Sequence, residues 1–555
     1  MTASATLRRA PLVFAALLLA CHARPANHGP AVASAALAGD WIGGYKIGKR
    51  YSLFALHLPS RAAERPSFDL PAEGVRAATL TDYLPAGDAL RFMLPGGRSK
   101  VALQGRLEHE SLIGAARVEG EEGSFEMRRM TPVEPEALRE YMGLYDAGAG
   151  HLIAFERMPE LAQLHFADFF SGRFNAIFPD GKDRFFAGPA LLVPAPAVMV
   201  LTFNRDPQGA ITGVTFQQDG EPDVVAVRVP TREAALEFQS GPLTLAGTLL
   251  APATPGPHPA VVLVPNERGA PRDAYRKDAD FLVSQGFAAL IYDRRGVGAS
   301  QGEASQTPIP ALADDALAAV ELLRGRADIE RGRVGVWGHS QGGWVATLAG
   351  ARSPAVAFVI NVSTPTLPAA EQEIYRIEHA MRVDGFSEPQ ILEAVNYQRL
   401  LMDWVRDGTG RDTLISVHRA AASAPWASYV SLPPSPLPDQ PRAATREFYR
   451  YDPIPAIAEL RCPALFVYGK ADSFVPVERS VPLIKTAMVR RSHPDTQLKV
   501  LPRTGHGMYE TDLDSRDALP LSRRHGQGYW QLLATWLSKA RVSAPPEPLA
   551  PAPGK

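Results

Sequence analysis

Cysteine is scarce in this chain, and the scarcity argues against two kinds of site. The 555 residues include only Cys21 and Cys462, which are too few for a disulfide framework. No group of histidines and cysteines has the spacing of metal ligands, so we expect no metal and no other cofactor. Cys462 stands beside Pro463 at the start of an apolar segment, where a free, buried thiol is the expected state.

An excess of charge of either sign is also missing. The 58 Lys and Arg residues balance the 59 Asp and Glu residues, and the formal net charge is −1. This balance gives no electrostatic reason to expect nucleic acid or an anionic polymer as a partner. Hydrophobic residues make up 46% of the chain, which is enough for a real core. The length and composition therefore indicate a globular protein of two or more domains.

The first apolar stretch is too short to span a membrane. Arg8 and Arg9 give the chain a basic start, and the apolar residues 11–20 follow. This pattern is typical of a signal peptide, with a buried first helix as the alternative. Residues 18–21 (Leu-Leu-Ala-Cys) resemble the lipobox of bacterial lipoproteins, in which the cysteine is lipidated and becomes the mature N-terminus. The resemblance implies export to the bacterial cell envelope and a lipid anchor on Cys21, with an unanchored periplasmic protein as the alternative.

Two segments fit the pattern Gly-x-Ser-x-Gly, and one of them has informative flanks. Residues 338–342 (Gly-His-Ser-Gln-Gly) follow the apolar run 334–337 and open into the apolar stretch 343–351. This sequence predicts a strand, a tight turn and a buried helix, which is the context of a nucleophile elbow. Ser340 is therefore the candidate nucleophile, and the backbone N–H of Gln341 is a candidate oxyanion donor.

The second copy of the pattern, residues 298–302 (Gly-Ala-Ser-Gln-Gly), lacks this context. A glycine-rich turn precedes it, and residues 303–308 after it show no helical pattern. A serine hydroxyl becomes a good nucleophile only when the fold holds it beside a base and near oxyanion donors. We therefore interpret this copy as a loop, with Ser300 as the alternative nucleophile.

Candidate partners for Ser340 follow later in the chain, in the order acid and then histidine. Asp472 lies in the loop after the predicted strand 464–469, and His506 lies in the loop after the predicted strand 497–501. We expect His506 to act as general base toward Ser340 and Asp472 to fix the tautomer of His506. Ser340, Asp472 and His506 each follow a predicted strand, and they occur in this order. This arrangement favours a catalytic role over that of unrelated polar residues in loops. Weaker alternatives for the acid and the base are Asp452, His493, Asp495 and His525.

Residues 240–540 resemble the α/β-hydrolase superfamily, particularly its bacterial esterase and serine-aminopeptidase-like branch. The resemblance rests on the elbow, the two later loops, the apolar strand 260–264 and residues 292–300 (Tyr-Asp-Arg-Arg-Gly-Val-Gly-Ala-Ser). It implies an α/β fold with a mostly parallel, doubly wound sheet. It also implies hydrolysis of a small ester or a short peptide through an acyl-enzyme.

The chain departs from this family at one functional position. The family usually has His-Gly after its first long buried strand, and Pro265 and Asn266 stand there in this chain. The second oxyanion donor must therefore be another backbone group. The N–H of Glu267 is the first candidate, and that of Asn266 is the second.

Residues 364–450 are predicted to form a helical cap over Ser340, because an insert at this point lies above the carboxyl ends of the strands. Ester and peptide hydrolysis use the same triad, so only the cap can separate the two reactions. A peptidase would need a carboxylate to hold a free amine, yet the acidic residues of the cap follow the pattern of solvated helix faces. We therefore favour a carboxylic ester, with a serine peptidase as the alternative. The cap acids are Glu371, Glu373, Glu378 and Glu388.

The predicted domain organisation follows from these motifs and from short alternating runs in the N-terminal half. It comprises a signal peptide (1–20), a tether (21–38), a β-rich module (39–130), a second β-rich module (131–231), an α/β-hydrolase domain (232–541) and a Pro- and Ala-rich tail (542–555). The β-rich modules carry no catalytic constellation and resemble β-rich regions found ahead of hydrolases. A non-catalytic protein, whose modules bind an envelope ligand, is the second class of function, and the complete triad argues against it.

One further helix can be predicted with its buried face. Apolar residues recur at helical spacing after residue 309, which indicates that one stripe of the helix packs on the sheet. The stripe consists of Leu312, Ala316, Val320 and Leu323.

Overall fold

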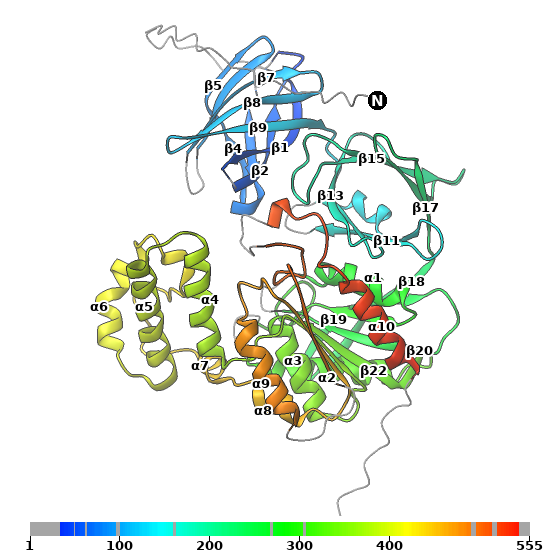
Figure 1. Ribbon diagram of the computed structural model, residues 1–555, viewed down its shortest axis with the longest axis vertical. Coiled ribbons are helices and arrows are strands. Elements are labelled where there is room, and N and C mark those ends of the chain that lie inside the picture. Colours follow the sequence, from blue (N-terminus) through cyan, green and yellow to red (C-terminus); the bar gives the residue numbers. More distant parts are fainter. Residues whose placement is uncertain are drawn as a thin grey trace, which may run out of the picture.

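The computed structural model describes residues 34–542 except for 49, 62–63, 96–99, 159–162, 267–269, 304–306, 490–495 and 513–518. Two β-rich modules are followed by a larger α/β domain with a helical lobe at its side (Figure 1). The predicted signal peptide with Cys21, the candidate oxyanion donor Glu267, and the alternatives His493 and Asp495 lie outside the described residues.

The first module is an antiparallel sheet in the order β4-β3-β2-β1-β9-β8-β7-β6-β5. Alternating residues point to one face, where Phe54, Phe92 and Phe125 pack against one another in a core that belongs to this module. Its elements are β1 (Gly39–Ile47), β2 (Arg50–Leu58), β3 (Ser67–Leu70), η1 (Pro71–Glu73), β4 (Val75–Thr79), β5 (Thr81–Ala86), β6 (Ala89–Leu94), β7 (Val101–Glu108), β8 (Ser111–Val118) and β9 (Glu121–Met130).

A histidine between two carboxylates lies on the other face of this sheet. His57 Nδ1 bonds to Asp40 across the β1–β2 pair, and His57 Nε2 lies 3.5 Å from Asp69 Oδ2 on β3. The hydrogen bonds to Asp40 and then to Asp69 raise the pKa of His57 to about 9. Protonated His57 therefore ties three neighbouring strands together.

We expect this histidine to make the stability of the module depend on pH. The pKa of about 9 in the folded state exceeds the ordinary value of 6.5. The stabilisation is therefore complete below about pH 6.5 and is lost as the pH rises through about 9. Calorimetry should show a larger Tm difference between wild type and His57→Gln at about pH 6 than at about pH 10. An equal difference at both pH values would contradict the assignment.

The second module is a closed antiparallel barrel of strands β10 to β17. Tyr145, Phe155 and Phe203 pack edge to face in its interior, so aromatic side chains form the barrel core. Residues 180–181 and 206–209 lie in the turns that follow β13 and β15. The elements are η2 (Ala137–Tyr141), β10 (Gly143–Asp146), β11 (Leu152–Met158), β12 (Gln163–Asp168), β13 (Phe174–Pro179), β14 (Arg184–Ala187), β15 (Met199–Arg205), β16 (Ile211–Gln217) and β17 (Val224–Arg228).

The third domain, which runs from β18 to α10, confirms the predicted α/β fold class. Its sheet has the order β18-β19-β21-β20-β22-β23-β24-β25, and the strands from β20 onward run parallel. The chain passes from β20 to β21 on one side and then crosses to β22 on the other side of β20. This reversal creates a switch point, where parallel sheets bind ligands. The strands are β18 (Thr231–Ser240), β19 (Leu243–Pro252), β20 (His258–Val264), β21 (Ala288–Tyr292), β22 (Ile329–His339), β23 (Val359–Val362), β24 (Ala464–Gly469) and β25 (Gln497–Leu501).

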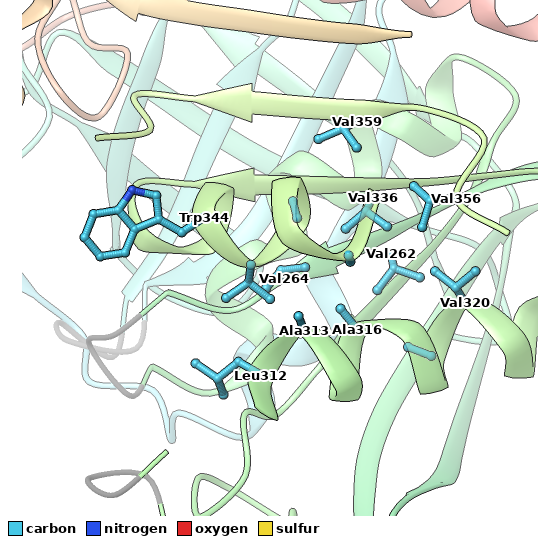
Figure 2. Packing of buried hydrophobic residues seen from close by; sticks show 14 of the residues in the cluster. Val262, Val264, Leu312, Ala313, Ala316, Val320, Val336, Trp344, Val356 and Val359 are labelled. Carbon is cyan, nitrogen blue, oxygen red and sulfur yellow. The ribbon is translucent and has the colours of Figure 1, made fainter. Parts of the chain in front are cut away.

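Helices cover both faces of this sheet. The predicted stripe of α2 packs on the sheet, as Figure 2 shows for Ala316 and Val320 near Val262 and for Leu312 below Val264. Helices α3, α8 and α9 share that face, and α1 and α10 pack on the opposite one. The helices are η3 (Arg272–Tyr275), α1 (Arg276–Ser284), α2 (Ile309–Arg324), α3 (Gln341–Arg352), α8 (Ile454–Glu459), α9 (Val477–Val489), η6 (Leu519–Leu521) and α10 (Tyr529–Val542).

A helical insert between β23 and β24 forms a separate lobe beside the sheet (Figure 1). Trp404, Trp426 and Tyr429 are buried in the core of this lobe, so these aromatic residues stabilise it. The helices are α4 (Ala369–Val383), α5 (Glu388–Asp407), α6 (Arg411–Ala422), η5 (Ala427–Tyr429) and α7 (Ala443–Arg450). Within the part of the chain that the structure describes, every helix is too short or too polar to cross a membrane.

Candidate active site

The elbow serine stands between a strand and a helix. Strand β22 ends at His339 and α3 begins at Gln341, which leaves Ser340 alone in the turn. Ser340 has φ 55° and ψ −125°, a conformation that costs energy for any residue other than glycine. Its N–H donates to the carbonyl of Val362 at 2.8 Å, so the turn is held against the neighbouring strand β23.

Two glycines allow this turn to be tight. A Cβ on Gly338 would lie 2.2 Å from the carbonyl oxygen of Gly342, and a Cβ on Gly342 would lie 2.8 Å from that of Val264. Both oxygens belong to the backbone and cannot move away like a flexible side chain. The absence of a side chain at Gly338 therefore lets the strand approach the start of α3, and its absence at Gly342 lets α3 approach the end of β20.

Asp472 and His506, the candidate acid and the candidate base, form a hydrogen-bonded pair. His506 Nδ1 lies 3.0 Å from Asp472 Oδ2, and the side chain of Asp472 is fully buried. The other carboxylate oxygen accepts the N–H groups of Phe474 at 2.8 Å and Val475 at 2.9 Å. The buried carboxylate is thus held by backbone donors and oriented toward the histidine ring.

The His506 loop is held against the elbow by residues on the two central strands. The carbonyl of His506 accepts hydrogen bonds from His339 Nε2 at 2.9 Å and from Ser363 Oγ at 2.8 Å. The rings of His339 and Phe474 each lie 4.9 Å from the ring of His506. Because His339 is adjacent to Ser340 in the chain, the three predicted catalytic residues share one corner at the carboxyl ends of β22, β24 and β25.

The candidate oxyanion donors differ in their surroundings. Gln341 is the first residue of α3, where backbone N–H groups and the helix dipole favour an anion. The N–H of Asn266 donates to the hydroxyl of Tyr275 at 2.7 Å, so it serves a structural bond in this conformation. Arg294 lies between these two segments, 3.3 Å from Gln341 Oε1 and 3.4 Å from the carbonyl of Asn266.

Among the alternatives that the structure describes, Ser300, Asp452 and His525 make contacts that hold the fold together. The hydroxyl of Ser300 is buried, donates to the carbonyl of Asp293 at 2.7 Å and accepts the N–H of Ala246 at 2.9 Å. Asp452 accepts the N–H of Ile454 in a turn. His525 is buried among aromatic side chains.

The sequence gives no signal for two residues that contact the loops of His506 and Asp472. His339 occupies a variable position of the Gly-x-Ser-x-Gly pattern, so the pattern gives no signal for its bond to His506. Gln372 on α4 donates to the carbonyl of Phe474. This bond connects the helical insert to the loop that carries Asp472. Neither contact follows from local sequence, because each joins residues that are far apart in the chain.

The sequence model of the alpha/beta hydrolase family matches residues 261–518. This part of the chain has the α/β-hydrolase fold. The hydrolase domain therefore combines the family fold with the geometry described above, and strands β1 to β17 precede the matched region.

Curated proteins and solved structures also show similarity to this chain. The chain is 25% identical over 288 residues to the quorum-quenching protein AidA of Acinetobacter baumannii, covering 49% of this chain and 87% of that protein. It is 30% identical over 178 residues to the esterase EstD of Thermotoga maritima, covering 30% of this chain and 42% of EstD. An esterase structure from Pyrococcus furiosus aligns with 15% identity and a TM-score of 0.36, over 56% of this chain and 91% of that one.

The described residues offer no grouping of three or more His, Cys, Asp or Glu side chains that could hold a metal ion. Cys462 is free and buried, as the sequence predicts, and burial raises the pKa of its thiol to about 12. The thiol is therefore protonated at neutral pH and is a poor nucleophile.

Proposed function

We propose that the protein is a serine hydrolase that cleaves a carboxylic ester through an acyl-enzyme. The observation that carries this proposal is the buried Asp472–His506 pair beside an elbow serine with φ 55°. Such a serine is kept in a costly conformation where its hydroxyl projects from the turn, and a triad needs this arrangement.

In the proposed reaction, His506 takes the proton of Ser340 Oγ as that oxygen attacks the ester carbonyl. Asp472 holds the Nδ1–H of His506 and stabilises the imidazolium that forms. The N–H of Gln341 stabilises the oxyanion, and the loop after β20, which carries Asn266 and Glu267, supplies the second donor. His506 then gives the proton to the leaving alcohol, and water releases the acyl group by the same steps.

The charges of the cap support an ester over a peptide with a free amine. Three of its four candidate glutamates are already paired with arginine, which leaves little net charge to attract an ammonium group. Glu378 is the remaining candidate for an amine site. The pairs are Glu371 with Arg479 at 2.8 Å, Glu373 with Arg376 at 2.7 Å and Glu388 with Arg382 at 2.9 Å.

A side-by-side assay tests this substrate class. We expect p-nitrophenyl esters of short and medium acyl groups to be cleaved at least about tenfold faster than aminoacyl or dipeptidyl p-nitroanilides, measured as kcat/KM. Glu378→Gln should leave ester turnover unchanged, as should the matched control Glu388→Gln at an exposed position. Faster anilide turnover that Glu378→Gln abolishes and Glu388→Gln does not would establish a peptidase instead.

We propose further that the protein is exported to the cell envelope and anchored by a lipid on Cys21. This proposal rests on the signal-peptide pattern and the Leu-Leu-Ala-Cys sequence at 18–21. Cys21→Ala should move the protein from the membrane fraction to the soluble fraction, because the lipid would be its only anchor. Mass spectrometry of the mature N-terminus should find a lipidated cysteine. An unmodified terminus downstream of Cys21 would indicate a soluble periplasmic protein.

A further inference from the structure

The segment 519–526, which precedes α10, joins the barrel to the catalytic domain. The barrel and its loops bond to the backbone of this segment. The N–H of Leu191 donates to the carbonyl of Ser522 at 2.8 Å, and the N–H of Phe174 donates to that of Arg523 at 3.3 Å. In return, the N–H of His525 donates to the carbonyl of Gly172 in the β12–β13 loop at 2.8 Å. These bonds attach the segment to strand β13 and to the neighbouring loops of the barrel.

The same segment bonds to the His506 loop on its other side. The N–H of Glu510 donates to the carbonyl of Arg524 at 2.9 Å, and the N–H of Gly526 donates to the carbonyl of Met508 at 2.8 Å. The loop itself is closed by a bond from the N–H of Gly505 to the carbonyl of Tyr509 at 2.9 Å. His506 lies inside this closed turn, so it is separated from the barrel by one hydrogen-bonded segment.

Aromatic side chains fill the junction between the barrel and this loop. The ring of Phe174, the first residue of β13, lies 4.6 Å from the ring of Tyr509 and 4.7 Å from that of His525. The His525 ring lies 4.9 Å from Trp530 on α10. Phe174 is 1% exposed and His525 is 2% exposed. The contact between their rings is therefore part of a core that is continuous between the barrel and the α/β domain. Lys277 Nζ lies 5.9 Å from the Tyr509 and Trp530 rings.

The barrel also fixes the helix that carries Lys277. Glu156 on β11 accepts the N–H of Lys277 at 2.7 Å, near the N-terminus of α1, where a carboxylate stabilises a helix. The other oxygen of Glu156 lies 3.2 Å from His165 Nδ1 on β12. Backbone bonds, ring contacts and a helix cap thus hold the barrel and the hydrolase domain together at the back of the His506 loop.

We propose that the barrel positions the catalytic histidine, with Phe174 and His525 as positioning residues. The inference rests on the proposed function of His506. A loop that carries a catalytic group needs rigid support, since a displacement of about 1 Å costs roughly 100-fold in rate. Here that support is the barrel strand β13, reached through the ring of Phe174 and the segment 519–526. This part of the barrel thereby supports the loop that carries His506.

Phe174→Ala in the full-length protein tests this role with two esters of one acyl group. A p-nitrophenolate leaves without a proton, whereas an alkyl alcohol needs the proton of His506. A displaced His506 should therefore lower kcat/KM for the alkyl ester by about 100-fold, and for the nitrophenyl ester by about tenfold. Phe174→Leu keeps an apolar contact. Its ratio of kcat/KM for the alkyl ester to kcat/KM for the nitrophenyl ester should lie between the ratios of wild type and Phe174→Ala. Partial unfolding would instead lower the rates on both esters by the same factor.

Phe216→Ala is the matched control, because Phe216 is a buried barrel residue whose ring contacts are with Phe155 and Phe166 in the barrel core. It should lower Tm comparably and leave the ratio of the two esters at its wild-type value. Equal loss on both esters in Phe174→Ala and in Phe174→Leu would overturn the positioning role. Retention of wild-type rates by folded Phe174→Ala would overturn it as well. The proposed function would fail separately, if Ser340→Ala kept the activity of wild type.

Discussion

Replacing Ser340 with alanine is expected to lower kcat for a p-nitrophenyl ester by about four to six orders of magnitude. The variant loses the only atom that forms the acyl-enzyme, and what remains is binding and oxyanion stabilisation. Alanine keeps the φ of 55° at a similar cost, so the fold should persist. Steady-state kinetics together with circular dichroism check the prediction.

Ser300→Ala provides the matched control, because Ser300 stands in the other Gly-x-Ser-x-Gly segment. Its hydroxyl bridges Asp293 and Ala246, so the variant should lose stability by about 1 kcal/mol or more and keep most of its kcat. If folded Ser340→Ala retained more than about 1% of the wild-type kcat, the nucleophile assignment would be wrong.

Asp472→Asn is expected to lower kcat by about four orders of magnitude, because the amide favours the wrong tautomer of His506. The amide oxygen can still accept the N–H groups of Phe474 and Val475, so the loop should keep its shape. Asp452→Asn is the control, since that carboxylate only caps a turn. Adding Asp472→Asn to Ser340→Ala should cost little further rate, because the residues act as one unit. A near-normal rate for Asp472→Asn alone would require a different acid.

The parts of the site that the sequence predicts are those with local signals. The apolar run before Ser340, the glycines around it and the alanine-rich stretch after it encode strand, turn and helix within a few residues. The stripe on α2 is periodic, and the structure buries it against the sheet. The cap helices α4 and α5 likewise follow apolar periodicity and carry Pro at or near the start.

The parts that the sequence left open depend on contacts between distant residues. Closure of the second module into a barrel requires β10 to pair with β17, through Tyr145 with Arg228 and Asp146 with Val227, and no local pattern encodes that pairing. The bond from the Asn266 N–H to Tyr275 Oη is a second case, because it depends on where η3 packs. The contact of Phe174 with Tyr509 is a third, and it joins modules that the sequence treats separately.

We propose above that Ser340 is the nucleophile of a serine hydrolase. Reaction of the full-length protein with a fluorophosphonate, followed by proteolysis and mass spectrometry, tests it most directly. We expect one adduct on the peptide that contains Ser340, with no labelling of Ser340→Ala and greatly slowed labelling of a His506→Ala variant. An adduct on Ser300, or undiminished labelling of Ser340→Ala, would contradict it.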